Sequence, residues 1–285
     1  MDNEELEYQD DGLQMWETGP WAEKKYRVLY NYMQMVSRGM KNIWDKRVYV
    51  DLYAGCGCVR IKNSDKVFKG SPLLALSVSD PFDKYIFCEK GDEKNPWQLN
   101  ALKTRVTKLS NEKDIVIIEG DCNQKIDDII SEIPKKHGQK VLTFCFVDPF
   151  SLNLHFDTLR RLAVEHRVDF LTLLALMMDG NRNSNHYEKE ESDKIDLFLG
   201  QQEWRNRWSL AKIKDNSFPR FLAKEFENQM LSIGYIKGSK KNTVEIRSLE
   251  KNLPLYHLAF FSKHERGYDF WNKGVVYSDD QGTFF

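Results

Sequence analysis

The sequence has no stretch that could cross a membrane, because no apolar run approaches the roughly 18 to 20 residues that a spanning helix needs. Its N-terminus lacks the basic, apolar and small-residue order of a secretory signal, so we expect a cytoplasmic protein without membrane contact. The five cysteines are an odd number without the regular spacing of a disulfide framework, which indicates reduced thiols. Internal repeats and low-complexity linkers are also missing.

An excess of charge of one sign is missing as well. The formal net charge of the 285 residues is -1, so no global field attracts nucleic acid. The first seventeen residues nevertheless hold seven acids and no base, which predicts a mobile acidic tail over residues 1–18 and a single domain over residues 19–285. Between Arg205 and Lys251, eleven basic residues face five acids. This excess could hold a polyanion or form a solvated helical face.

Apolar strand patterns and amphipathic helical patterns alternate along the chain. Strands are expected near residues 48–53, 85–88, 115–118, 141–147 and 168–176. The crossovers between these strands have helical length. Parallel pairing requires crossovers of this kind, so these strands are expected to be parallel. Two late strands, near 241–247 and 256–262, have no helical pattern between them and should pair antiparallel. The sequence therefore predicts an α/β fold with a mostly parallel seven-stranded sheet, an antiparallel edge and a helical insertion at about 180–235.

Polar residues follow four successive strands of this predicted sheet. Asp51 and the Gly55/Gly57 turn end the first strand, and Glu89 ends the second. Asp121 and Asp148 follow the third and fourth strands. Ligands of open α/β sheets bind beyond the carboxyl ends of the strands, so these residues predict a pocket for a nucleoside-type cofactor. Residues 58–70 alternate apolar and polar side chains, which indicates a hairpin flap next to that pocket.

The same residues resemble a known enzyme class. Asp51-Leu52-Tyr53-Ala54-Gly55-x-Gly57 with Glu89, Asp121 and Asp148-Pro149-Phe150 is similar to the Rossmann-like class I methyltransferases that use S-adenosylmethionine. From about Trp21 to Trp271 the chain more specifically resembles the bacterial three-Cys-motif partner proteins. The further matching stretches are Trp21-x-x-x-Lys25 with Tyr32, Gly70-Ser71-Pro72, Glu119-Gly120-Asp121 and Met178-Asp179-Gly180-Asn181-Arg182-Asn183.

The resemblance implies a cofactor site for S-adenosylmethionine. Its residues would be Asp51, Tyr53, Gly55, Gly57, Glu89 and Asp121. In this class the glycine turn lets the backbone approach the methionine and ribose parts of the cofactor, the acid at Glu89 binds the ribose hydroxyls, and the acid at Asp121 binds the adenine amino group. Asp51 would then help to hold the cofactor's amino group.

The resemblance also implies an acceptor site. Asp148 would accept a hydrogen bond from the target nitrogen, Pro149 would fix the turn, and Phe150 would stack on the base. Lys25 is expected to bind substrate. Arg182 and Asn183 lie in a polar loop where they could contact a substrate phosphate or carboxylate, or cap a helix. Nucleic acid and a three-Cys-motif protein are the expected partners.

Several alternatives remain open from the sequence. Cys56, Cys58, Cys88 and Cys122 could converge on a metal, or they could simply pack around a tight turn; we predict no metal. His155 follows the Asp148 motif and could act as a base. A non-catalytic protein that binds a nucleotide or another protein is the alternative to a methyltransferase, and a metal-dependent nuclease using the carboxylates is a third reading.

Overall fold

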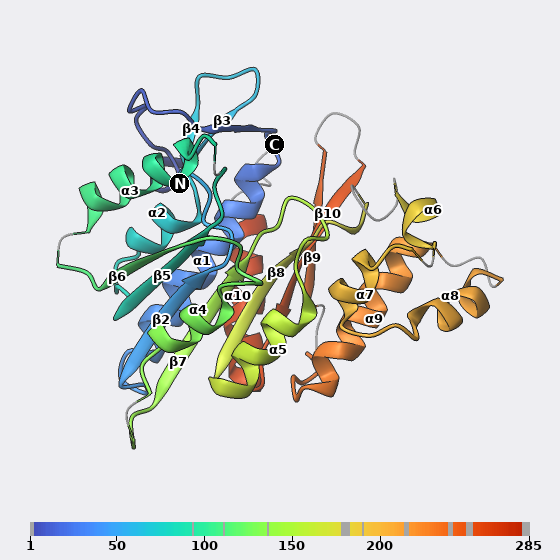
Figure 1. Ribbon diagram of the computed structural model, residues 1–285. Coiled ribbons are helices and arrows are strands. Elements are labelled where there is room, and N and C mark those ends of the chain that lie inside the picture. Colours follow the sequence, from blue (N-terminus) through green and yellow to red (C-terminus); the bar gives the residue numbers. More distant parts are fainter. Residues whose placement is uncertain are drawn as a thin grey trace.

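The computed structural model describes residues 3–92, 94–110, 112–135, 137–177, 183–189, 191–213, 217–238, 242–248 and 253–280. Seven strands form one sheet in the order β6-β5-β2-β7-β8-β10-β9 (Figure 1). Their bounds are β2 Lys46–Asp51, β5 Lys84–Glu89, β6 Ile115–Glu119, β7 Val141–Val147, β8 Val168–Leu174, β9 Thr243–Arg247 and β10 Pro254–Phe261. The first five are parallel, whereas β10 runs antiparallel to β8 and β9. The predicted α/β fold, with a mostly parallel seven-stranded sheet and an antiparallel edge, is confirmed.

Helices cover both faces of this sheet, and strand alternation decides which side chains meet them. Tyr49 and Asp51 of β2 point to the face covered by α1 (Ala22–Met40), α2 (Ser71–Leu76), α3 (Trp97–Leu109) and α10 (Glu265–Asp280). Val48 and Val50 point to the face covered by α4 (Ile126–Glu132) and α5 (Phe156–Glu165). Strands buried on both faces explain the continuous apolar runs in the sequence.

The helical insertion lies between β8 and β9, on the same side of Figure 1 as the antiparallel edge. It comprises α6 (Ser184–Tyr187), α7 (Lys194–Leu199), α8 (Trp204–Lys212) and α9 (Phe218–Ser232). α7 and α9 pack on α5 and on each other through apolar contacts such as the stacked rings of Phe198 and Phe226, 5.1 Å apart.

A second, small sheet lies at the carboxyl-end edge of the main one, at the top of Figure 1. It contains β1 (Trp16–Thr18), β3 (Cys58–Ile61) and β4 (Val67–Lys69), and β3 with β4 is the predicted hairpin. β1 pairs parallel to β3. The expectation of a mobile tail over residues 1–18 is therefore wrong for the segment 6–18. Leu6 is buried, and its carbonyl accepts a hydrogen bond from the Lys69 N–H at 2.8 Å.

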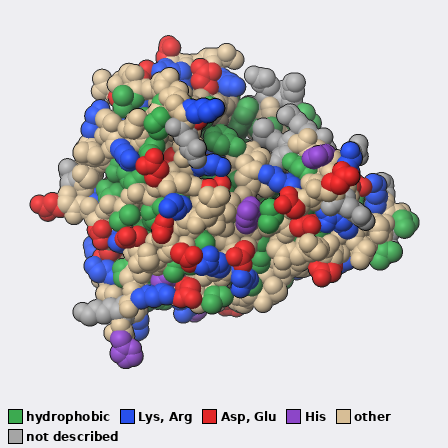
Figure 2. Space-filling model, viewed as in Figure 1, with side chains coloured by type: hydrophobic (Ala, Val, Ile, Leu, Met, Phe, Trp, Pro, Cys, Tyr) green, Lys and Arg blue, Asp and Glu red, His purple; other side chains and the backbone are tan. Residues whose placement is uncertain are grey.

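No helix within the described ranges is both long and apolar enough to span a membrane. Figure 2 shows acidic and basic side chains interspersed over the face in view, without a large patch of one sign. This mixture agrees with the net charge of -1.

Candidate functional site

The candidate site lies where β2 is flanked by β5 on one side and β7 on the other. The strand order reverses there, which creates a crevice beyond the carboxyl ends of the strands. Asp51 is the register partner of Phe146, so Asp148 lies two residues past that partner, directly after the end of the adjacent strand β7. Because side chains alternate, Asp51 and Asp148 emerge on the same face, the one covered by α1.

Asp51 lies beneath the glycine turn and is 0% exposed. Its carboxyl accepts hydrogen bonds from the Tyr49 hydroxyl at 3.1 Å, from the Tyr53 N–H at 3.2 Å and from the Ser71 side chain. Burial raises the pKa of Asp51 to about 7, although these hydrogen bonds oppose the rise. The carboxyl therefore changes charge near neutral pH. It also stabilises the turn by accepting the hydrogen bond from the Tyr53 N–H.

The turn after β2 is held by Glu89. Gly55 has a φ of 63°, a left-handed conformation that favours glycine, and its N–H donates to Glu89 Oε2 at 2.6 Å. Glu89 Oε1 accepts from the Gly91 N–H at 3.0 Å. A Cβ added at Gly55 would meet nothing within 4 Å. The backbone of Gly55 is thus accessible to a ligand, and the Glu89 carboxylate next to it is held in place by two backbone N–H groups.

Asp121, after β6, shapes the next turn. Its Oδ1 accepts hydrogen bonds from the N–H and the side-chain amide of Asn123, at 3.0 and 2.9 Å. Lys90 lies 3.3 Å from Oδ2. Asn123 Oδ1 in turn accepts from the backbone N–H of His155, the residue before α5. The loops after β6 and β7 are therefore tied together.

Asp148 is paired with Lys25 of α1. The Lys25 ammonium donates to Asp148 Oδ2 at 2.6 Å, and it lies 4.5 Å from the centre of the Tyr26 ring. Burial would lower the pKa of Lys25, but Asp148, Tyr26 and Tyr256 outweigh it and raise that pKa above its ordinary value. Lys25 is buried, so the structure places this predicted substrate ligand against the acid of the motif.

The remaining residues of the Asp148 motif differ sharply in exposure. Pro149 is buried, whereas Phe150 is 80% exposed. The Phe150 ring packs edge-on against Trp16 of β1, with 5.7 Å between ring centres. The N-terminal segment therefore reaches the Asp148-Pro149-Phe150 motif, which the sequence alone did not indicate.

Arg105 of α3 is a further residue that the sequence analysis missed. It is 0% exposed, and its guanidinium donates to both carboxylate oxygens of Asp11 at 2.9 and 2.8 Å. It also donates to the carbonyls of Leu13, Gln14 and Cys56 at 3.1, 3.2 and 2.7 Å. The guanidinium lowers the pKa of Asp11. Arg105 thus joins the N-terminal segment to the glycine turn.

All five cysteines are free and buried. Burial raises the pKa of Cys58 and of Cys122 to about 12, so both are neutral thiols at physiological pH. Within the described parts of the chain, no group of three or more His, Cys, Asp or Glu side chains could hold a metal ion.

Asn183 precedes α6, and its carbonyl accepts hydrogen bonds from the N–H groups of His186 and Tyr187. Arg182, with the rest of the stretch 178–182, lies outside the described residues.

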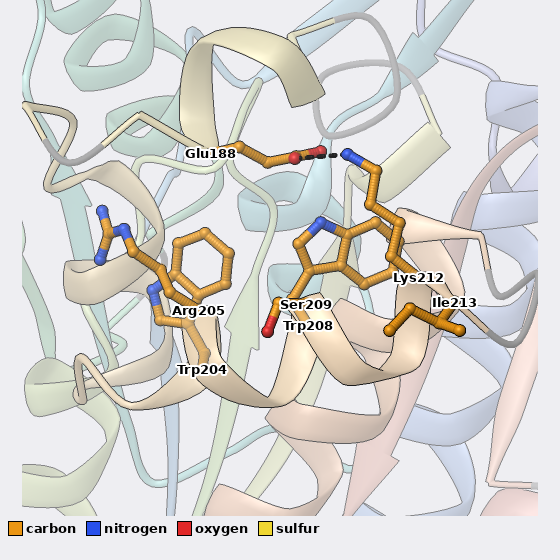
Figure 3. A pocket seen from close by; sticks show the side chains of 7 residues that line it. All are labelled: Glu188, Trp204, Arg205, Trp208, Ser209, Lys212 and Ile213. Atoms are coloured by element: carbon orange, nitrogen blue, oxygen red, sulfur yellow. Dashed lines mark hydrogen bonds and ion pairs between the residues drawn. The ribbon is translucent and has the colours of Figure 1, made fainter.

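The surface has two hollows. One, in the insertion, is lined by residues that include Trp204, Trp208 and Ile213, and the ion pair of Glu188 with Lys212, at 2.7 Å, crosses it (Figure 3). The other lies along residues 10–17 and β3. None of the acids predicted to bind cofactor lines either hollow.

Comparison with known proteins identifies the fold only. No family model matches the sequence, and no curated protein matches it. Protein LPL1258 from Legionella pneumophila, described under the family model DUF519, superposes with a TM-score of 0.52 at 11% identity, over 91% of this chain and 92% of that one. A putative caffeoyl-CoA O-methyltransferase from Staphylococcus aureus gives 0.39 at 11% identity, over 81% and 82% of the two chains. The O-methyltransferase TomG from Streptomyces achromogenes, solved with SAM, gives 0.38 at 5% identity, over 91% and 93%.

Proposed function

We propose that the protein is an S-adenosylmethionine-dependent methyltransferase, related to the three-Cys-motif partner proteins, that acts on an amino group of a nucleic acid or nucleobase-like acceptor. One observation carries the proposal. The Gly55 turn, fixed by Glu89, lies at the switch point of the sheet, next to a strand that ends in Asp148-Pro149-Phe150.

The residues present suit this cofactor. Space is open at Gly55, so a ligand can approach its backbone. Each Glu89 oxygen accepts one backbone N–H and keeps a second lone pair for a ribose hydroxyl. When bound, the cofactor would supply a methyl group. The bond from that methyl to sulfur would break with the electron pair left on sulfur, a bond to the acceptor nitrogen would form, and that nitrogen would lose one proton to solvent.

The chain's own part in such a transfer is orientation and charge. Lys25 holds Asp148 Oδ2, so an acceptor amine would donate to Oδ1. The ion pair with Lys25 fixes the Asp148 side chain in place, which would align the lone pair of the acceptor nitrogen. Phe150, on the exposed side of the same motif, would pack on the ring that carries the amine.

Calorimetry with S-adenosylmethionine and with its demethylated product tests the proposal. Glu89→Gln should weaken binding about 10- to 100-fold, because the amide puts N–H groups where backbone donors point. Glu119→Gln is the matched control, since Glu119 is the register partner of Glu89 on β6 and is exposed. Absence of heat with both ligands would end the methyltransferase proposal.

A non-catalytic binding protein is the second candidate, and the Lys25–Asp148 pair favours it, because an ammonium already occupies one oxygen of the acid. Asp148→Asn separates the two. A methyltransferase should lose methyl transfer and keep its cofactor affinity, whereas a binding protein should keep its association with a three-Cys-motif protein in a pull-down.

A further inference from the structure

Three aromatic rings meet on the surface beside the acceptor motif. Trp16 of β1 lies 5.2 Å from Trp97, the first residue of α3, and 5.7 Å from Phe150, measured between ring centres. These three residues are the aromatic cluster. Trp16 is 40% exposed and Phe150 is 80% exposed, so large apolar rings are left facing water. Exposed rings that converge from three distant parts of a chain indicate a binding surface.

The cluster is not needed to hold the N-terminal segment in place. Trp16, Glu17 and Thr18 already pair with β3, and Arg105 makes two hydrogen bonds to Asp11 and three to backbone carbonyls. The segment is therefore fixed at both ends of residues 11–18 without help from the Trp16 ring. The Trp16 ring is therefore partly exposed even though the backbone that carries it is held in place.

A groove of about 770 Å³ adjoins the cluster. It is lined by Asp10, residues 12–17, Arg60 and Lys62 of the hairpin, and Trp97. Arg60 is the register partner of Glu17 and donates to Asp10 at 2.5 Å. Two cations against two acids leave little net attraction for a phosphate backbone, so ring contacts should dominate any affinity.

We infer that the aromatic cluster is a stacking surface for an unpaired base of a single-stranded nucleic acid, and that residues 10–18 belong to the acceptor site. The inference rests on the proposed function, because Phe150 follows Asp148 in the acceptor motif. Aromatic side chains stack on any base, whereas a duplex hides the base faces. The surface thus selects single strands, and Trp16 and Trp97 supply contacts beyond Phe150.

Fluorescence anisotropy tests this with labelled RNA and DNA single strands of about 12 nucleotides, and with the matching duplex, on the full chain saturated with the demethylated cofactor product. Trp16→Ala and Phe150→Ala should each weaken single-strand binding about 5- to 150-fold. Trp16→Phe should restore most of the affinity, because a ring returns. Leu210→Ala, at an exposed apolar position of α8, is the control and should bind as the unaltered protein does.

Salt dependence gives a second readout. With Arg60 and Lys62 as the cations of the groove, the slope of log affinity against log salt should be no steeper than about -1.4, at roughly 0.7 per phosphate contact. A much steeper slope, equal affinity for the duplex, or unchanged binding by Trp16→Ala would overturn the inference. So would a failure of every single strand to bind.

These failures are distinguishable from failure of the proposed function. Cofactor affinity is measured by calorimetry on the same variants, and Trp16→Ala should leave it unchanged. If the unaltered protein binds cofactor but no single strand, the stacking surface is wrong and the methyltransferase proposal stands. If no cofactor binds, the methyltransferase proposal itself is lost.

Discussion

Ionisation of Asp51 should make the protein less stable as the pH rises through neutrality. The carboxyl is 0% exposed, and burial raises its pKa from the ordinary 3.8 to about 7. A raised pKa means that the folded state holds the proton more tightly than the unfolded state does. The resulting stabilisation is complete below about pH 4 and is lost as the pH passes through about 7.

The size of the effect follows from the shift. Three pH units correspond to about 4 kcal/mol between the two limits, of which about 2–3 kcal/mol falls between pH 5 and pH 8. Asp169, whose pKa burial raises to about 6, adds about 1 kcal/mol of the same sign over that interval. Burial lowers the pKa values of His166 and His257, which act in the opposite direction. The useful quantity is therefore the difference between the unaltered protein and a variant at each pH.

Urea unfolding of ligand-free protein at several values between pH 5 and 8 measures that difference. Asp51→Asn keeps an oxygen that can accept the Tyr53 N–H but cannot ionise. The stability advantage of the unaltered protein over this variant should shrink by about 2–3 kcal/mol from pH 5 to pH 8. Asp169→Asn should show a smaller change of the same sign. Parallel curves for the unaltered protein and Asp51→Asn would refute the reasoning.

Three further substitutions test other contacts. Arg105→Ala leaves a buried carboxylate and three carbonyls without their donor, so unfolding should cost about 3–5 kcal/mol less, and limited proteolysis should cut residues 6–18 first. Lys25→Met should destabilise by a similar amount, and adding Asp148→Asn should recover part of the loss, so additive losses in chemical denaturation would contradict a coupled pair. Gly70→Ala should lower the melting temperature, since the new Cβ would lie 2.9 Å from the Gly57 carbonyl oxygen, and an unchanged value would show that the hairpin base yields freely.

The central sheet could be predicted because its signals are local. Each strand is a short apolar run, and each acid at a strand end follows its strand directly in the chain. The positions of Asp51, Glu89 and Asp148 therefore come from counting along the sequence. What each acid contacts could not be predicted in this way. Lys25 and Asp148 are 123 residues apart, and only the packing of α1 on β2 and β7 brings them together.

The N-terminal segment shows why charge patterns mislead. Seven acids and no base indicate a solvated tail when only neighbours in the sequence are considered. The compensating cation, Arg105, lies 94 residues from Asp11. One signal could have indicated it, because Arg105 follows Leu102 by three residues and so falls on the apolar stripe of its helix.

Helix α10 was not expected, and its glycines explain why. Gly267 and Gly274 lower helix propensity by about 1 kcal/mol each relative to alanine. A Cβ at Gly274 would lie 3.4 Å from the backbone of Tyr32, at ordinary van der Waals distance, so α10 packs closely on α1 at this point. The gain from that contact is tertiary, and a local pattern cannot reveal it.

Arg105 connects the two halves of the proposed site, which gives the N-terminal segment a consequence for both ligands. Its guanidinium binds the Cys56 carbonyl inside the glycine turn and the Asp11 carboxylate five residues before Trp16. Arg105→Lys cannot make both sets of contacts, because an ammonium has three donors and no planar fork. This variant should therefore weaken cofactor and single-strand binding together, whereas Trp16→Ala should weaken only the second. Loss of cofactor binding alone would mean that the segment is held in place independently of the turn.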